Sequence, residues 1–224
     1  MKLTKEQIQK IEDYLTNKDV EYIDLHLEVL DHISTDIENI MTENKVDFNN
    51  AFEDVKLKWD KTFTYKWTFW LGISNGGSKL FIDHCLEIYK PLSLKIIISI
   101  LIFTSSFYWF IKSYNIELIT YKSIIHKASI AFSVIFALII YYWIFSIKRT
   151  KLKSTFSYLF TKHIAPTLFS VFIFLVLDEF NNQQEFKFIK VLMFSSFVAI
   201  LWMGNIFYKN HLKAVLNFKK YQLK

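Results

Sequence analysis

The chain has 224 residues, of which 52% are hydrophobic and 18% aromatic, and its formal net charge is +6 at pH 7. The charge is unevenly divided, because residues 1–58 carry seven lysines against fourteen acidic residues, a net charge of −7. The remaining basic residues flank apolar segments, as lysines near lipid headgroups do, so the composition does not favour a nucleic-acid-binding protein. The single cysteine, Cys85, excludes an internal disulfide and fits a reducing compartment.

The chain begins with a predicted amphipathic helix. Thr4 and Gln7 have the spacing of a capping box, and apolar residues at helical spacing follow as far as about Leu15. A second, longer helix is predicted from Val20 to about Thr42. Its apolar stripe consists of Ile23, Leu27, Leu30, Ile33, Ile37, Ile40 and Met41.

A third short helix completes a predicted cytoplasmic headpiece, which covers residues 1–58. Asp47 is placed to cap this helix, and its apolar face begins at Phe48 and ends at Trp59. About 58 residues is marginal for an independent core, so we expect the headpiece to lean on a neighbouring segment or on a partner. Its negative charge suits contact with the basic segments that flank the membrane, or with a basic partner protein.

The order of these three helices resembles the permease-prefix domain, also called the HAAS-type domain. The likeness rests on residues 30–38 and 48–55, and residues 45–47 replace the glycine that often precedes the last helix of such modules. The resemblance implies a cytoplasmic helical module in front of transmembrane segments, as in bacterial proteins linked to PadR-type transcription regulators or ABC exporters. The whole chain also resembles integral membrane proteins of flavobacteria.

Residues 59–90 are predicted to form an aromatic, amphipathic connector at the membrane interface. Residues 62–69 alternate aromatic and polar side chains like a strand, whereas Trp59, Phe63, Trp67 and Trp70 are spaced as on a helix. The many rings and nearby lysines favour an interfacial helix that continues the third helix, with a place in the headpiece core as an equal alternative. Residues 75–77 predict a turn, and the amphipathic helix after it is expected to stop at Pro91.

Four apolar segments predict an all-α membrane domain over residues 91–208, followed by a basic tail over residues 209–224. The segments cover residues 92–110, 128–147, 156–177 and 191–208. About 20 helical residues cross a hydrocarbon core of about 30 Å, and none of the four segments shows the alternation of a barrel strand. The third segment is the weakest candidate for a membrane span. It is long enough only if Lys162 counts as part of its inner end, with the charged tip of its side chain reaching the headgroups.

The lysine distribution predicts the orientation of these segments. The loop after the second segment carries five basic residues and no acid, whereas the first loop has three lysines and one acid and the third has two lysines and three acids. Because positive loops face the cytoplasm, both termini are predicted to be cytoplasmic in a bacterial inner membrane. The predicted interface residues are Trp59, Trp67, Trp70, Lys148, Arg149, Lys151 and Lys153.

Metal or cofactor chemistry has few candidates in the sequence. Glu28, His32 and Asp36 share one face of the second helix and are weak candidate metal ligands, although a solvated acidic face is the favoured interpretation. His163 and His211 are both predicted at the inner ends of membrane segments, where a bridging haem or metal is the less favoured alternative. We therefore expect no resident cofactor and no metal.

The apolar segments offer packing surfaces in place of catalytic groups. Ser129, Ser133 and Ala137 are spaced four apart and form a small-residue face suited to close helix packing. No charged residue is near the middle of a segment, which argues against a channel or transporter built from this chain alone. A phosphate-binding glycine loop, a nucleophile elbow and a zinc motif are also absent from the sequence.

These features predict a non-enzymatic inner-membrane protein, a regulator or accessory protein whose headpiece binds a partner. The alternative is a small subunit of a membrane transport complex, in which a partner chain supplies the substrate path. Expected partners are the lipid bilayer and either another protein or further copies of the same chain, and nucleic acid is not expected.

Overall fold

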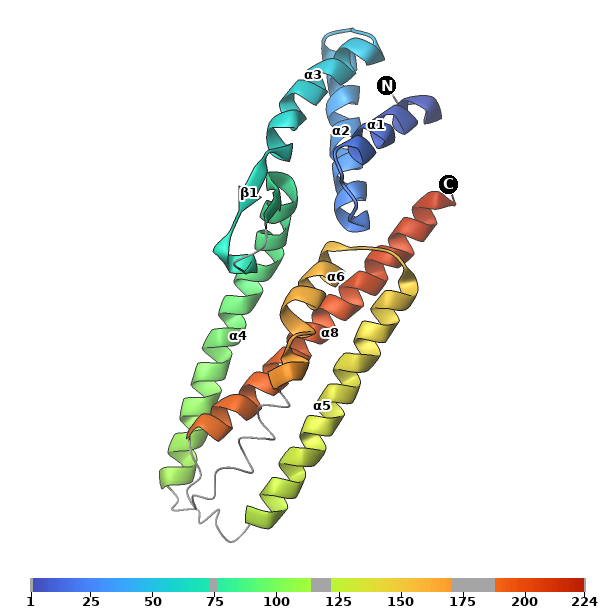
Figure 1. Ribbon diagram of the computed structural model, residues 1–224. Helices are drawn as coiled ribbons and strands as arrows, with labels where there is room; N and C mark the ends of the chain where they lie inside the picture. Colours follow the sequence, from blue (N-terminus) through green and yellow to red (C-terminus); the bar gives the residue numbers. More distant parts are fainter. Residues whose placement is uncertain (1, 73–75, 114–121, 171–187, 224) are drawn as a thin grey trace. The chain divides into compact units, whose positions relative to one another are not determined.

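The computed structural model describes residues 2–72, 76–113, 122–170 and 188–223, most of which are helical (Figure 1). The chain forms two compact units. The first contains Met1–Ile88, Leu152–Thr155 and His211–Lys224, and the second contains Tyr89–Lys151 and Phe156–Asn210. The first unit thus extends beyond the predicted headpiece and takes in two later stretches of the chain.

The N-terminal helices begin where their capping residues predict. Helix α1 (Lys5–Asn17) has a complete capping box, in which the Gln7 amide donates to Thr4 Oγ1 at 3.3 Å and the Thr4 amide donates to Gln7 Oε1 at 2.8 Å. Helix α3 (Phe48–Asp60) is capped by Asp47, which accepts from the Asn50 amide at 3.3 Å. Both predicted caps are confirmed, because each depends only on residues within one turn of the helix start.

Helix α2 (Ile23–Glu43) lies in contact with both α1 and α3 and provides the centre of the headpiece core. Ile33 and Ile37 from the predicted stripe are completely buried, whereas Leu27, Ile40 and Met41 are only partly covered. The headpiece therefore has a small apolar core of its own. Its most deeply buried members are Ile11, Leu15, Ile33, Ile37, Ala51 and Val55.

Residues 59–78 do not form the interfacial helix that was predicted for them. Helix α3 ends at Asp60, a 3-10 turn η1 (Lys61–Phe63) follows, and strand β1 (Tyr65–Trp67) pairs antiparallel with β2 (Gly76–Ser78). The strand alternative is correct for β1, and the fold is not purely helical. A Cβ on Gly76 would lie 1.9 Å from Tyr65 Oη, so glycine leaves room for the cross-strand ring. The predicted turn residue Asn75 lies outside the described residues, and Gly76 and Gly77 belong to β2.

Helix α4 (Lys79–Ser113) runs through Pro91, so the predicted stop at this proline was wrong. Proline inside a helix removes one backbone hydrogen bond, here the one to the Glu87 carbonyl, but its φ is compatible with helix. Ser93 Oγ donates to the Lys90 carbonyl at 3.0 Å and provides an extra bond in this turn. The apolar segment after Pro91 is long enough to continue the helix despite the lost hydrogen bond.

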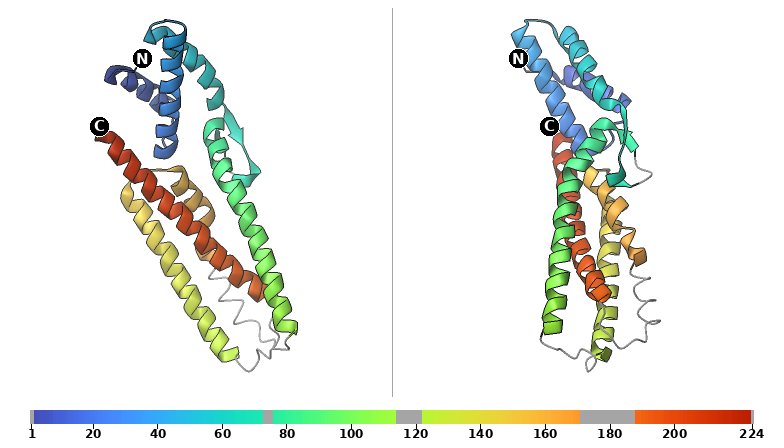
Figure 2. Two further views of the ribbon diagram at one scale, coloured as in Figure 1. Left: turned by 180° about the vertical axis from the view of Figure 1, so that it is seen from behind. Right: turned by 90° about the vertical axis from the view of Figure 1, so that its left-hand side faces the viewer.

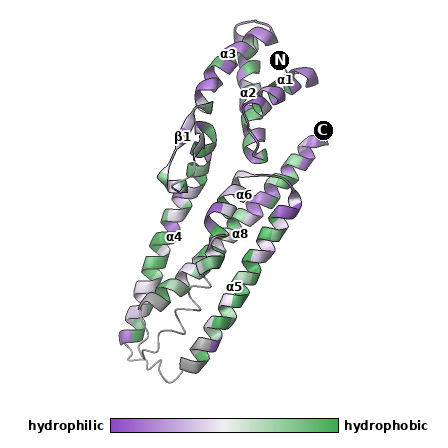
Figure 3. Cartoon of the chain, in the orientation of Figure 1, coloured by the Kyte–Doolittle hydropathy of each residue, from purple (hydrophilic) through white to green (hydrophobic). Residues whose placement is uncertain are grey.

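Three described helices, α4, α5 (Lys122–Thr150) and α8 (Phe188–Gln222), are long and apolar enough to cross a membrane. Apolar residues occupy much of their length (Figure 3), and many of the apolar side chains are exposed, which is consistent with lipid contact. The predicted third segment begins as α6 (Thr155–Leu159) and a π-helical turn η4 (Phe160–Ile164), and its residues 171–177 lie outside the described chain. The predicted tail is helical, because α8 continues to Gln222.

Within the second unit, α8 contacts both α4 and α5 through buried side chains. Thr104 Oγ1 and Ser195 Oγ are 2.8 Å apart, and the rings of Phe136 and Phe197 lie 4.9 Å apart between centroids. The predicted small-residue face lies partly inside the unit, because Ser133 is completely buried while Ser129 and Ala137 are half-buried. Close packing of small side chains thus accompanies the aromatic contacts between helices.

Replacing Gly204 with alanine should destabilise the second unit. A Cβ there would lie 2.8 Å from Trp143 Cζ3 and 3.2 Å from Ile164 Cγ2. The Trp143 ring is held against Tyr208 at 5.8 Å and cannot move freely. Crowding typically costs about 1–3 kcal/mol, more than the gain of about 1 kcal/mol from the helix propensity of alanine. Thermal unfolding of the full chain in detergent should show a lower Tm.

The double variant Gly204→Ala with Trp143→Phe provides the control for this prediction. The smaller ring relieves the contact and should restore part of the lost Tm. If Gly204→Ala instead raises the Tm in the presence of Trp143, helix propensity dominates at this position and the close approach has no energetic weight.

Candidate functional site

Several contacts between distant parts of the sequence lie in the first unit, at the start of α2. The Ile23 amide donates to the Lys153 carbonyl at 2.9 Å, and the Thr155 amide donates to Asp24 Oδ1 at 2.8 Å. Lys153 also forms an ion pair with Glu21. The basic loop after α5 is therefore fixed to the acidic N-terminal region, in agreement with the predicted attraction between the two.

The end of α8 completes this contact region, which we call the joint and define as residues 21–24, 152–155 and 211–221. His211 Nδ1 lies 2.8 Å from Ser154 Oγ, and Tyr221 Oη donates to Glu12 Oε1 at 2.7 Å. N-terminal, loop and C-terminal residues thus belong to one compact unit. The apolar side chains of the joint are Ile23, Leu152, Ala214, Val215 and Phe218.

The Asp24 carboxylate lies at the start of two helices, since Asp24 is in the first turn of α2 and Thr155 begins α6. Helix N-termini favour a negative charge, which explains an acid at this position. Asp24 Oδ2 and Thr155 Oγ1 are buried and have no hydrogen-bond partner among the described residues. The joint therefore holds polar atoms that are only partly satisfied, which makes it sensitive to substitution.

The pairing of Ser154 with His211 has the composition of a nucleophile and a base, but its geometry is structural. Both side chains are completely buried, so a substrate carbonyl has no access to the hydroxyl. His211 is a candidate that the sequence indicates, whereas Ser154, Thr155 and Asp24 are not. A Ser-Thr pair just before an apolar run is a helix-start signal that marks residues 154 and 155, whereas nothing local indicates that Asp24 meets them.

The three candidate metal ligands on α2 do not converge. Glu28 Oε2 lies 3.7 Å from His84 Nδ1, while Asp36 Oδ2 accepts from Lys58 Nζ at 2.8 Å and Trp59 Nε1 at 3.1 Å. His32 is exposed. Burial alone would raise the pKa of Asp36, but the hydrogen bonds from Lys58 and Trp59 outweigh burial and lower it. In the described ranges, no three His, Cys, Asp or Glu side chains are arranged to hold a metal ion.

His163, the other histidine considered as a ligand, lies in the second unit and stacks on Tyr89. The two ring centroids are 4.0 Å apart, and His163 Nε2 is buried without a hydrogen-bond partner among the described residues. The ring is therefore placed by packing against an aromatic side chain.

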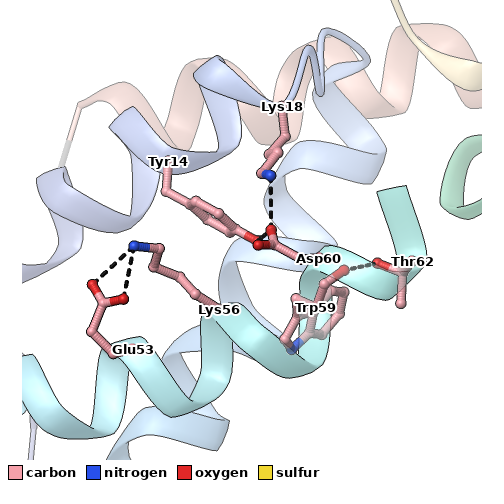
Figure 4. A network of polar contacts seen from close by, with 7 residues as sticks. All are labelled: Tyr14, Lys18, Glu53, Lys56, Trp59, Asp60 and Thr62. Carbon is pink, nitrogen blue, oxygen red and sulfur yellow. Dashed lines mark hydrogen bonds and ion pairs between the residues drawn. The ribbon is translucent and has the colours of Figure 1, made fainter. Parts of the chain in front are cut away.

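A polar network links α1 to the end of α3 (Figure 4). Tyr14 Oη donates to Asp60 Oδ1 at 2.8 Å, and Lys18 Nζ lies at the same distance from this oxygen. Hydrogen bonds from Lys18 and Tyr14 lower the pKa of Asp60, and burial together with the Asp60 contact raises the pKa of Tyr14. The Tyr14 ring also makes edge contacts with Phe52 and Phe63, so the network is anchored in an aromatic cluster.

The Asp60 contacts predict acid sensitivity of the first unit. Because the folded-state pKa of Asp60 is lowered, its stabilisation is present above the ordinary aspartate pKa of about 4 and is lost as pH falls. Its side chain is 43% exposed, so the contribution should be below about 1 kcal/mol. Asp60→Asn should lower the Tm at neutral pH and flatten the loss of Tm on acidification.

The measurement is thermal unfolding of the full chain in detergent over a series of pH values. Asp54→Asn is the matched control, because Asp54 is exposed on the same helix and should leave the pH profile unchanged. If Tm falls with pH in parallel for Asp60→Asn and the unmodified chain, the Asp60 contacts do not cause the acid sensitivity.

The predicted interface residues lie in four different settings. Trp59 is hydrogen-bonded to Asp36, and Lys153 belongs to the joint. Trp67 and Trp70 are 51% and 39% exposed on and next to β1. Three exposed basic side chains lie in the last turn of α5 or just after it: Lys148, Arg149 and Lys151.

Acidic side chains on α2 and α3 remain exposed after the internal contacts of the headpiece are made. Asp31 on α2, Glu43 at its end and Asp54 on α3 are exposed, and none forms an ion pair within the described parts of the chain. We call these three residues the acidic face.

Comparison with protein-family models, curated proteins and solved structures finds no match for the chain.

Proposed function

We propose that the chain is a non-enzymatic, regulatory or accessory protein of the bacterial inner membrane, whose headpiece binds a basic segment of a partner protein. The observation that carries this proposal is the acidic face. Most of the apolar stripes of α1, α2 and α3 are used in the headpiece core, so the exposed side chains of these helices are mainly polar or charged. Charge complementarity of this kind steers association and selects partners.

The cytoplasmic orientation is part of the same proposal. It is supported by the lysine-rich end of α5 and by the joint, which collects the N-terminal region, the loop after α5 and the end of α8 in one unit. Basic residues flanking membrane segments are retained in the cytoplasm. A C-terminal fluorescent-protein fusion should be fluorescent in the cytoplasm, and a C-terminal alkaline phosphatase fusion should be inactive.

The partner is tested with the tagged full chain, cross-linked in native membranes before purification. The triple variant Asp31→Asn, Glu43→Gln, Asp54→Asn should lose most of the cross-linked partner. Its control is Asp13→Asn, Asp19→Asn, Glu87→Gln, which changes the net charge equally at exposed positions outside the acidic face. Equal recovery with both variants would contradict a role for the face.

The identity of the recovered chain decides between the proposed roles. A soluble regulatory protein with a basic segment supports the regulatory role. An ATPase or permease subunit supports membership of a transport complex. Recovery of this chain alone would show self-association and would overturn binding to a different protein.

A further inference from the structure

The two-stranded element of the first unit carries a group of exposed aromatic rings. We call residues 65–72 and 76–78 the aromatic hairpin. Its first strand begins with Tyr65, which is 76% exposed, and the 3-10 turn η2 (Phe69–Leu71) begins with Phe69, which is 71% exposed. Trp67 and Trp70 are 51% and 39% exposed, so four rings within six residues reach the surface. Large rings are seldom exposed together on a water-facing surface.

Internal contacts fix the backbone that presents these rings. The Lys79 amide donates to the Thr64 carbonyl at 2.6 Å, and the Gly72 amide donates to the Phe69 carbonyl at 2.9 Å. Lys66 forms an ion pair with Asp83 of α4, and Leu71 is 1% exposed. The hairpin is therefore attached to the first turns of α4 (Figures 1 and 2), and its rings are exposed from an ordered scaffold.

The charge near the hairpin is opposite to that of the headpiece. Residues 58–79 contain four lysines and one aspartate, whereas residues 1–58 carry a net charge of −7. Two of these lysines are ion-paired, Lys58 with Asp36 and Lys66 with Asp83, and the exposed Lys61 and Lys79 supply the positive charge near the hairpin. Exposed aromatic rings with lysines among them match the headgroup layer of a bilayer, where rings lie at the boundary and cations meet phosphate groups. An acidic or phosphate-bearing surface thus suits this part of the chain.

We propose that the aromatic hairpin binds the lipid headgroup layer of the membrane into which α4 inserts. The argument for lipid as the occupant is continuity of the chain, because β2 ends immediately before α4, a helix long and apolar enough to span. The tether keeps a bilayer within reach of the hairpin at high effective concentration. This inference is independent of any protein partner on the acidic face.

The test uses the full chain in nanodiscs of mixed phosphatidylcholine and phosphatidylglycerol, with no other protein present. Phe69→Cys is labelled with an environment-sensitive fluorophore, and Asn39→Cys, exposed on α2, carries the same label as the control. Cys85 is completely buried, and the unmodified chain measures its background labelling. The label at residue 69 should be quenched several-fold more by nitroxide lipids, and less by aqueous iodide, than the label at residue 39.

A second measurement avoids the influence of the label. The double variant Trp67→Phe, Trp70→Phe removes two native fluorophores. The difference in tryptophan emission between the unmodified chain and this variant is the emission of Trp67 and Trp70. We expect brominated lipids to quench this emission. If the lost emission is insensitive to brominated lipids, or if iodide reaches residue 69 as readily as residue 39, the hairpin does not bind lipid and the proposal is overturned.

Discussion

Replacing Ile37 with alanine should destabilise the headpiece by about 2–5 kcal/mol, the usual cost of truncating a buried isoleucine. Ile37 is 0% exposed at the centre of α2, and neither α1 nor α3 can easily fill the cavity because both are held by their own contacts. Hydrogen exchange of the full chain in nanodiscs should show faster exchange throughout α1, α2 and α3.

Leu57→Ala provides the matched control for Ile37→Ala. Leu57 is 68% exposed on α3, and removing it should cost no more than about 0.5 kcal/mol. The slow amides of α5 should be unchanged in both variants, because α5 belongs to the second unit. Faster exchange in α5 with Ile37→Ala would show that the two units unfold together and would refute a modular headpiece.

Replacing Asp24 with alanine should open the joint. The substitution removes the carboxylate that accepts from the Thr155 amide, and hydrogen bonds to charged groups are worth about 1.5–3 kcal/mol. The Thr155 amide would then be left without its acceptor. The Ile23 amide, which donates to Lys153 in the same region, should also exchange faster.

Asp31→Ala is the control for Asp24→Ala, since Asp31 is exposed two turns later on the same helix. It changes the net charge equally and should leave exchange at Ile23 and Thr155 unaffected. Unchanged exchange at both amides in Asp24→Ala would mean that Asp24 contributes little to the joint, and that its apolar contacts hold the segments together.

Local features of the fold could be predicted from the sequence. The caps at Thr4 and Asp47 and the buried positions Ile33 and Ile37 follow from spacing within a few turns of helix. The apolar lengths of α4, α5 and α8 are likewise visible without any knowledge of their neighbours.

Features that depend on distant residues could not be predicted in this way. Strand β1 forms because Gly76 and Gly77 pair with it, and the same aromatic spacing fits a helix when that partner is ignored. Pro91 is accommodated because the apolar segment after it outweighs one lost hydrogen bond. The joint brings together Asp24, Ser154 and His211. These residues are too far apart in the sequence for a local pattern to indicate that they meet.

The burial of Cys85 gives the protein a built-in reporter of local opening. It is the single cysteine of the chain and is completely buried on α4, within the unit that contains the hairpin and the joint. A thiol reagent can react only when this region opens, so the rate of modification measures the population of the open state. Substitutions in the headpiece, the joint or the hairpin can thus be compared in intact membranes through one native sulfur atom.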